Sequence, residues 1–154
     1  MYGVDGSLST GWVQRGTFFV LAGGAPVATS VVPGSGSGPS QRFTFTVTDV
    51  GGSSYLTGLA ALIASSFNPN NACNLVYDRN TNRVSLSYDN ASNGASPVTP
   101  GSSTVVANSQ CSLKGANTTV TFTTTQLIVT MDLSFNSTFF GGKNIYLYAA
   151  EATA

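Results

Sequence analysis

The sequence contains no histidine and few charged residues, and each of these shortages excludes a class of function. Six lysine and arginine residues balance six aspartates and glutamates, so the formal net charge is zero and only 8% of the 154 residues are charged, against about 25% in typical proteins. Nucleic-acid binding requires a clustered basic surface, which six dispersed cations cannot supply, so no nucleic-acid partner is expected. A chain with so little charge is poorly suited to exist as a concentrated free monomer, which favours an assembled state.

The sequence also lacks the groupings of side chains on which most enzymes depend. Without histidine, a serine, threonine or cysteine nucleophile has no imidazole base, and neither a CxxC motif nor a calcium-binding run of aspartates occurs. Glycosidases need two carboxylates that flank the sugar, and nothing selects one pair here, because most acidic residues fall at strand ends or in turns. We therefore expect no enzyme activity, no cofactor and no metal. The acidic residues are Asp5, Asp49, Asp78, Asp89, Asp132 and Glu151.

Long apolar runs are absent and cysteines are few. No run of 18 or more apolar residues occurs, so no transmembrane helix is expected. The two cysteines, Cys73 and Cys111, either form a disulfide or remain as two buried thiols. A disulfide would close a loop of about 37 residues for a stabilisation of roughly 4 kcal/mol. It would also imply an oxidising compartment, so a secreted or cell-surface location is expected.

Alternation of apolar and hydroxyl-bearing side chains is the pattern that recurs along the chain. In the segment Gln41–Val50, apolar residues including Phe43 and Val47 alternate with threonines, which predicts a half-buried strand. Tyr55–Ser66 is compatible with a helix, but Gly58 interrupts it and strand-like segments surround it, so we interpret it as a strand bent at that glycine. About ten strands without a helix predict an antiparallel β-sandwich of Ig-like type. The other strands are expected at residues 26–32, 73–78, 83–88, 104–107, 110–113, 119–122, 126–135 and 144–150, with a polar loop at 90–103.

The N-terminal segment Gly11–Val20 has the composition of a strand but no evident partner. It contains the only tryptophan, Trp12, and two adjacent phenylalanines, all of which favour β-structure. Burial of each such side chain is worth roughly 1.5–3 kcal/mol, so some surface must cover the segment. We interpret residues 1–25 as a loop, this strand and a linker, and residues 26–154 as the sandwich body.

Four segments of the body resemble a known kind of module. They are NACNLVYDR at 71–79, SQCSLKGA at 109–116, LIVTMDLSF at 127–135 and KNIYLYAAE at 143–151. Together they resemble the tandem Ig-like modules of large secreted surface proteins of environmental bacteria, notably acidobacteria, over about four-fifths of the chain. Cys73 and Cys111 match the cysteine positions of that module, so the resemblance implies a disulfide between them. It implies no enzymatic activity.

The order of the segments departs from that family. A module of the family ends with a strand like YLYAA, a short Gly/Ser loop and a final strand like GW-x-x-x-GT-F-V, whereas here GWVQRGTFFV stands at residues 11–20, ahead of the module. Three arrangements stay open: the segment folds back on its own body, it inserts into the open sheet edge of a neighbouring subunit by β-augmentation, or the chain is a piece of a longer tandem array. Insertion requires no reversal of the chain at the linker 21–25, and a head-to-tail contact whose rotation does not close gives a filament.

The sequence therefore predicts a secreted structural subunit. It would assemble head to tail into an extracellular filament or pilus-like fibre, with copies of itself as partners, by donor-strand complementation. The interface would be made by the donor strand, through Trp12, Val13, Phe18, Phe19 and Val20.

An adhesive or carbohydrate-binding Ig-like module of a larger cell-surface protein is the alternative prediction. Aromatic side chains could form a platform on which sugars stack, although such residues more often pack across strands or between subunits. The candidates are Trp12, Tyr55, Tyr88, Tyr146 and Tyr148. Three N-x-[ST] sequons lie in expected loops or strand ends, where a glycan would project into solvent, although they arise easily by chance in a chain rich in threonine and asparagine. These sequons begin at Asn90, Asn117 and Asn136.

Overall fold

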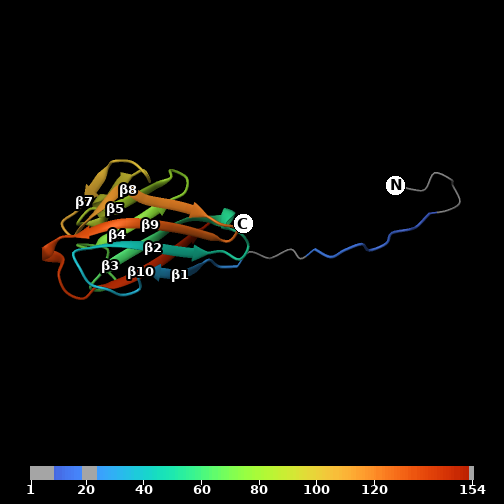
Figure 1. The fold of residues 1–154 in the computed structure, drawn as a ribbon, viewed down its shortest axis with the longest axis horizontal. Helices are drawn as coiled ribbons and strands as arrows, with labels where there is room; N and C mark the ends of the chain where they lie inside the picture. Colours follow the sequence, from blue (N-terminus) through green and yellow to red (C-terminus); the bar gives the residue numbers. More distant parts are fainter. Residues whose placement is uncertain (1–8, 19–23, 153–154) are drawn as a thin grey trace.

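The computed structural model describes residues 9–18 and 24–152, and within these ranges the chain is an all-β sandwich as expected. Two five-stranded antiparallel sheets pack face to face (Figure 1). The first sheet has the order β1-β2-β9-β8-β7, with β1 at Val27–Val32, β2 at Ser40–Thr48, β7 at Val105–Ala107, β8 at Cys111–Phe122 and β9 at Gln126–Phe135. The second has the order β10-β3-β4-β5-β6, with β3 at Leu56–Ala64, β4 at Cys73–Asp78, β5 at Arg83–Ser87, β6 at Ala95–Val98 and β10 at Asn144–Glu151. Three short 3-10 turns are η1 at Ser53–Tyr55, η2 at Ala91–Asn93 and η3 at Ser137–Phe139.

Alternating residues of both sheets meet in one core. Phe45 of β2, Leu75 of β4 and Val129 of β9 are completely buried, while the residues between them along each strand face outward, as the period of two requires. The two cysteines begin β4 and β8, one in each sheet, and their sulfur atoms are bonded at 2.10 Å. The disulfide therefore ties the two sheets together.

The ambiguous segment 55–66 is a strand because its neighbours require it. Most of it is β3, which pairs with β10 on one side and β4 on the other. A Cβ atom at Gly58 would lie 2.1 Å from the carbonyl oxygen of Tyr77 on β4, so only glycine permits this close approach of the two strands. On the β10 side the register shifts between Ala150 and Glu151, so the irregularity expected at this glycine is a β-bulge beside it.

The polar segment 90–103 was predicted as a loop, and that prediction was wrong for part of its length. Residues 95–98 form β6, which pairs with β5. The error has a physical origin: this strand contains Pro97 and only one buried apolar side chain, Val98, so it shows neither alternation nor typical strand composition. Proline is tolerated because β6 lies at the edge of its sheet.

The segments 110–113 and 119–122 were predicted as two strands but belong to one, β8. The strand pairs with β9 at both ends, and the register shifts between Lys114 and Thr119, where the intervening residues form a wide bulge. The Thr118 hydroxyl donates a hydrogen bond to the carbonyl oxygen of Lys114 at 2.9 Å and closes the bulge. The alternation loses its phase at this point, which explains why one strand resembled two.

The two ends of the sandwich carry different features. At one end β1 begins, β2 ends and β10 ends, with Glu151 beside Asp49; we call it the near end, because residues 24–26 lead into β1 there. The opposite end, here called the far end, carries the loops 33–39 and 136–143, which join β1 to β2 and β9 to β10 (Figure 1). The strands therefore run between a near end that holds the N-terminal connection and a far end formed by these two loops.

Candidate functional site

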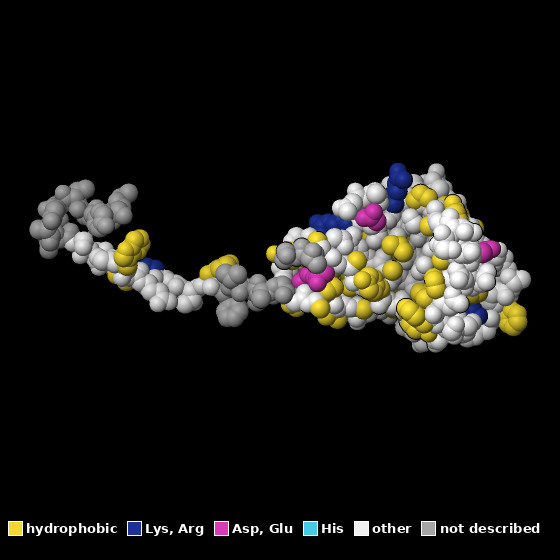
Figure 2. All heavy atoms as spheres, turned by 180° about the vertical axis from the view of Figure 1, so that it is seen from behind, with side chains coloured by type: hydrophobic (Ala, Val, Ile, Leu, Met, Phe, Trp, Pro, Cys, Tyr) yellow, Lys and Arg dark blue, Asp and Glu magenta, His cyan; other side chains and the backbone are white. Residues whose placement is uncertain are grey.

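Residues 9–18, here called the arm, carry the two most exposed aromatic side chains of the described residues. Trp12 is fully exposed, Phe18 is 91% exposed and Val13 is about half exposed. The arm lies away from the sandwich in Figure 1, and Figure 2 shows its hydrophobic side chains standing clear of the body. Exposure of both large aromatics is what a segment in need of a partner surface would show. Two other residues predicted for the interface lie outside the described part of the chain, Phe19 and Val20.

The arm has the pattern of a strand without the pairing of one. In a strand alternate residues share a side, so pairing of the arm with a sheet edge would place Trp12, Gln14, Gly16 and Phe18, and with them both described aromatics, on one side. Its side-chain hydrogen bonds are local, such as that from the Gln14 amide to the carbonyl oxygen of Gly16. Over the ranges described, no backbone hydrogen bond joins the arm to the sandwich, so its main-chain groups can still pair with a sheet edge.

One side of the sandwich offers such an edge. β1 and β10 are the terminal strands of the two sheets on that side, and neither has a further strand beyond it in the described chain. β10 is eight residues long. On the opposite side the terminal strands are β6, with four residues including Pro97, and β7, with three. Short strands and proline protect an edge against pairing, and β10 has neither protection.

The core is also less completely covered on the side of β1 and β10. Val31, Ile145, Leu147 and Ala149 point inward and pack against the core, but all four are only partly buried. On the opposite side Val98 of β6 is 1% exposed. Partly exposed apolar surface along a sheet edge is the kind of surface that an added strand covers.

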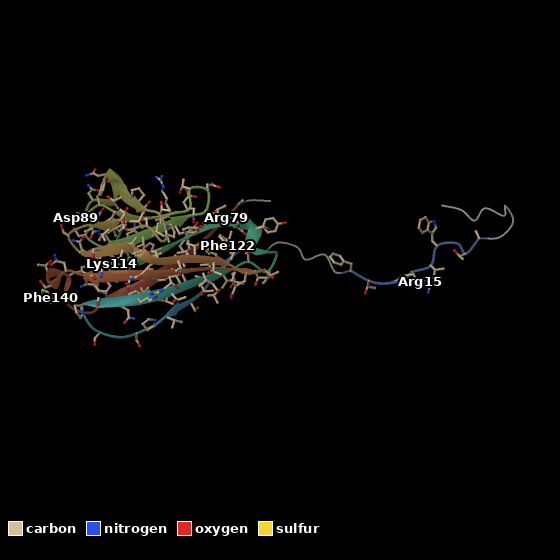
Figure 3. The ribbon with its side chains drawn as sticks, turned by 45° about the horizontal axis from the view of Figure 1, so that its top comes forward. Arg15, Arg79, Asp89, Lys114, Phe122 and Phe140 are labelled. Atoms are coloured by element: carbon tan, nitrogen blue, oxygen red, sulfur yellow. A yellow bond between two sulfur atoms is a disulfide. The ribbon has the colours of Figure 1, made fainter. Side chains whose placement is uncertain are left out.

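A hollow of about 920 Å³ opens at the far end of this side. Its rim is formed by the loops 33–39 and 136–143. Phe135 and Phe139 stack in its wall with their ring centroids 6.2 Å apart, and the ammonium group of Lys143 lies 4.5 Å from the centroid of Phe139. Other apolar side chains in the lining are Phe43, Ile63 and Ile145. In Figure 3, Phe140 marks this end of the molecule and Arg15 lies on the arm beyond the opposite end.

Two carboxyl groups meet at the near end. Asp49 is 1% exposed, and its Oδ1 accepts a hydrogen bond from the backbone N–H of Gly51 at 2.8 Å. Its Oδ2 is buried and accepts no hydrogen bond from an N–H or hydroxyl group of the described residues. Desolvation raises the pKa of Glu151 above its ordinary value, and so do a hydrogen bond with the neighbouring Asp49 carboxyl and the charge of that group. The near end therefore presents two adjacent carboxyl groups, of which that of Asp49 is buried.

The three sequon asparagines are all exposed, as a glycan would require. Asn90 and Asn136 precede η2 and η3, and the amide oxygen of each accepts a hydrogen bond from the hydroxyl two residues further on. This leaves the amide nitrogen, the atom that a glycan would join, outside those bonds. Asn117 lies in the β8 bulge, and its nitrogen donates to the Asp132 carboxylate at 2.8 Å. Attachment of sugar stays a prediction for all three.

The aromatic residues considered for sugar binding are dispersed. Tyr55 belongs to η1 at the near end, whereas Tyr88 follows β5 at the far end. Tyr146 on β10 packs edge-on against Phe67, with ring centroids 5.2 Å apart. Trp12 lies on the arm. Of the five candidates, the structure places only two next to each other on one strand face, Tyr146 and Tyr148.

The described residues hold neither a cluster of metal-ligating side chains nor a membrane-spanning helix. Grouped sets of three or more Cys, Asp or Glu that could bind a metal do not occur in ranges 9–18 and 24–152. In the same ranges the structure contains no helix of the length and apolar character needed to cross a bilayer.

Sequence reasoning predicts a donor segment at 11–20, which stays a prediction, but it did not locate a surface that could receive it. The alternation in 144–150 indicates which residues of β10 face inward, yet nothing local indicates that β10 is a terminal strand. The hollow was missed because its walls, 33–41 and 135–145, come from distant parts of the sequence.

Comparisons with models of known protein families, with curated proteins and with solved structures found no match to this chain. The arm, the free edge of β10 and the hollow are therefore the features from which a function can be inferred.

Proposed function

We propose that this protein is a structural subunit of an extracellular filament, in which the arm of each copy completes the sandwich of the next. One observation carries the proposal: an arm with two exposed aromatic side chains, Trp12 and Phe18, belongs to a sandwich whose longest terminal strand, β10, is paired on one edge only. Each aromatic gains roughly 1.5–3 kcal/mol on burial, and strand addition also pairs the main-chain groups of both partners.

The arm and the edge match in length. A strand rises about 3.3 Å per residue, so the eight residues of β10 extend for about 26 Å. The ten described residues of the arm reach about 33 Å when extended. One arm can therefore cover the whole free edge of one neighbouring β10.

The placement of donor and acceptor supports a polymer. Each copy has one arm, joined at the near end, and one open side along β1 and β10. A head-to-tail contact between two different surfaces repeats without limit unless its rotation closes a ring. Many copies of the chain would then form a filament in which only the terminal subunits keep an unfilled site.

Other features support a location outside the cell. The Cys73–Cys111 disulfide is the kind of bond that persists in oxidising surroundings. The outward face of the first sheet is rich in hydroxyl groups, among them Thr44 and Thr130, whose side-chain oxygens lie 3.1 Å apart. Such a face suits an exposed polymer surface, with or without sugars at the sequons.

Deletion of residues 1–22 tests the proposal. We expect the full chain to form filaments visible by electron microscopy and the deleted chain to remain monomeric in size-exclusion chromatography, because the donor strand is gone. A full chain with Thr17→Ala, a change on the opposite side of the arm from Phe18, serves as the control and is expected to polymerise. Filaments formed by the deleted chain would refute the proposal.

A further inference from the structure

We infer that the donated arm runs antiparallel to β10 of the neighbouring subunit, with Phe18 in the far-end hollow and Trp12 beside Asp49 and Glu151 at the near end. This inference rests on the proposed function and specifies the direction and position of the arm in its acceptor. It follows from the strand directions, the shape of the acceptor and the spacing of the two aromatics.

The direction follows from where the arm is attached. Residues 24–26 enter β1 at the near end, so a donated arm leaves its own subunit there. In a head-to-tail polymer every subunit points the same way, and the near end of one copy faces the far end of the next. The arm therefore enters its acceptor at the far end, with Phe18 close to that end and Trp12 further along.

This direction decides between the two free edges. β10 runs from the far end to the near end, whereas β1 runs from the near end to the far end. An arm entering at the far end has its own N-terminus toward the near end, so it is antiparallel to β10 and parallel to β1. Antiparallel pairing is slightly more stable per residue and is the commoner kind. β10 is also the longer of the two strands and pairs in unbroken register from Asn144 to Ala150.

The hollow fits an aromatic side chain in chemistry and in position. Phe43, Ile63 and Ile145 supply an apolar lining, and the rings of Phe135 and Phe139 supply faces and edges against which another ring can pack. The hollow lies where β10 begins, which is where the C-terminal part of the arm arrives. Phe18 is the described aromatic at that end of the arm.

The spacing of the two aromatics then places Trp12. Trp12 and Phe18 are six residues apart, as are Ile145 and Glu151, so Phe18 opposite Ile145 brings Trp12 opposite Glu151. The indole N–H is a donor without acceptor capacity. Close to that position lies the buried Oδ2 of Asp49, whose carboxyl group neighbours that of Glu151. The arm thus brings an N–H donor to two carboxyl groups that can accept a hydrogen bond from it.

An arm folded back on its own subunit would have the opposite direction. It would leave the near end and run along the free edge of β10 toward the far end of the same body, parallel to β10, with Trp12 at the hollow. The two arrangements therefore place opposite ends of the arm beside the same residue of β10. Thr17 lies opposite Tyr146 when the arm is donated in the direction inferred, and Val13 lies opposite Tyr146 when the direction is reversed.

Paired cysteines in the full chain distinguish these directions. Directly opposed residues in adjacent antiparallel strands have Cα atoms about 4.5–5.5 Å apart, within the range of about 4.4–6.8 Å that a disulfide spans. We expect the double variant Thr17→Cys with Tyr146→Cys to give a ladder of covalent oligomers on non-reducing gels after mild oxidation. The matched variant Val13→Cys with Tyr146→Cys is expected to give none. The native Cys73–Cys111 bond is buried, and variants with a single new cysteine control for unspecific linkage.

A third pair separates failure of the inference from failure of the proposed function. Arg15 lies opposite Tyr148 in the inferred direction, in which Phe18 faces Ile145, and also in the reversed direction, in which Trp12 faces Ile145. The pair Arg15→Cys with Tyr148→Cys therefore reports docking of the arm on β10 in either direction. A ladder from the Val13 pair would overturn the inferred direction. A link from the Val13 pair within a single chain would show a folded-back arm and overturn the proposed function as well. Filaments without a link from any pair would place the arm elsewhere and overturn the inference alone, and a full chain that forms no filaments would remove the proposed function.

Discussion

Replacement of Phe18 by alanine gives a quantitative test of assembly through the arm. Phe18 is 91% exposed in the free chain, so nearly all of its side chain gains burial if it enters the hollow of a neighbour. That burial is worth about 1.5–3 kcal/mol, and each 1.4 kcal/mol corresponds to a factor of about ten in an equilibrium constant. Phe18→Ala should therefore raise the critical concentration for polymerisation by about 10- to 150-fold.

Light scattering across a dilution series of the full chain measures that concentration directly. Thr17→Ala is the matched control, because it changes the adjacent residue on the outward side of the arm and should alter the critical concentration only slightly. Unfolding of both variants in denaturant should follow that of the unchanged chain, since the arm makes no backbone hydrogen bond with its own described body. Equal effects of the two substitutions would contradict burial of Phe18 between subunits.

Three further predictions concern the sandwich. Gly58→Ala should lower the free energy of unfolding by about 1–3 kcal/mol or more, because the added Cβ would lie 2.1 Å from the carbonyl oxygen of Tyr77. Denaturant titration measures this change. An unchanged unfolding midpoint would show that β3 and β4 do not approach this closely. Reduction of the disulfide should cost roughly 4 kcal/mol, seen as a lower melting temperature in reducing buffer, and an unchanged melting temperature would argue against the bond. The pKa of Glu151 is raised in the folded chain above its ordinary 4.5, so folding favours the protonated carboxyl group. The stability that this group contributes is therefore present below pH 4.5 and is lost as pH rises through the folded pKa. Glu151→Gln should therefore melt at a higher temperature than the unchanged chain at pH 7 and at the same temperature well below pH 4.5, and a difference that does not depend on pH would contradict this assignment.

The regular strands could be predicted from the sequence because their burial repeats every two residues. In residues 41–50 and 126–135 each inward-facing side chain is apolar and nearly every outward-facing one is polar, so the sequence of each segment is enough to predict a strand. Even the apolar segment 55–66 could be assigned, because Gly58 disfavours a helix. In these regions the local sequence and the tertiary structure agree.

Prediction failed where pairing partners decide the structure. The strand at 95–98 forms because β5 offers an edge, although its own residues favour a loop. The bulge in β8 depends on Gly115, whose Cβ would lie 2.8 Å from the carbonyl oxygen of Ser102, a contact that no local pattern reveals. The free edge of β10 and the far-end hollow escaped prediction for the same reason, since an edge is defined by the absence of a neighbouring strand and the hollow by loops distant in sequence.

The orientation of the strands has a consequence for mechanical strength. β10 runs from the far end to the near end, the direction in which successive subunits would be joined, and β3 pairs with it along its whole length. Tension applied to such a fibre acts along the strands, whereas the hydrogen bonds between the arm and β10 are perpendicular to them. Those bonds would be loaded together in shear and would not be peeled apart one after another. A contact made without any covalent bond between subunits could then withstand pulling forces far better than its equilibrium affinity alone suggests.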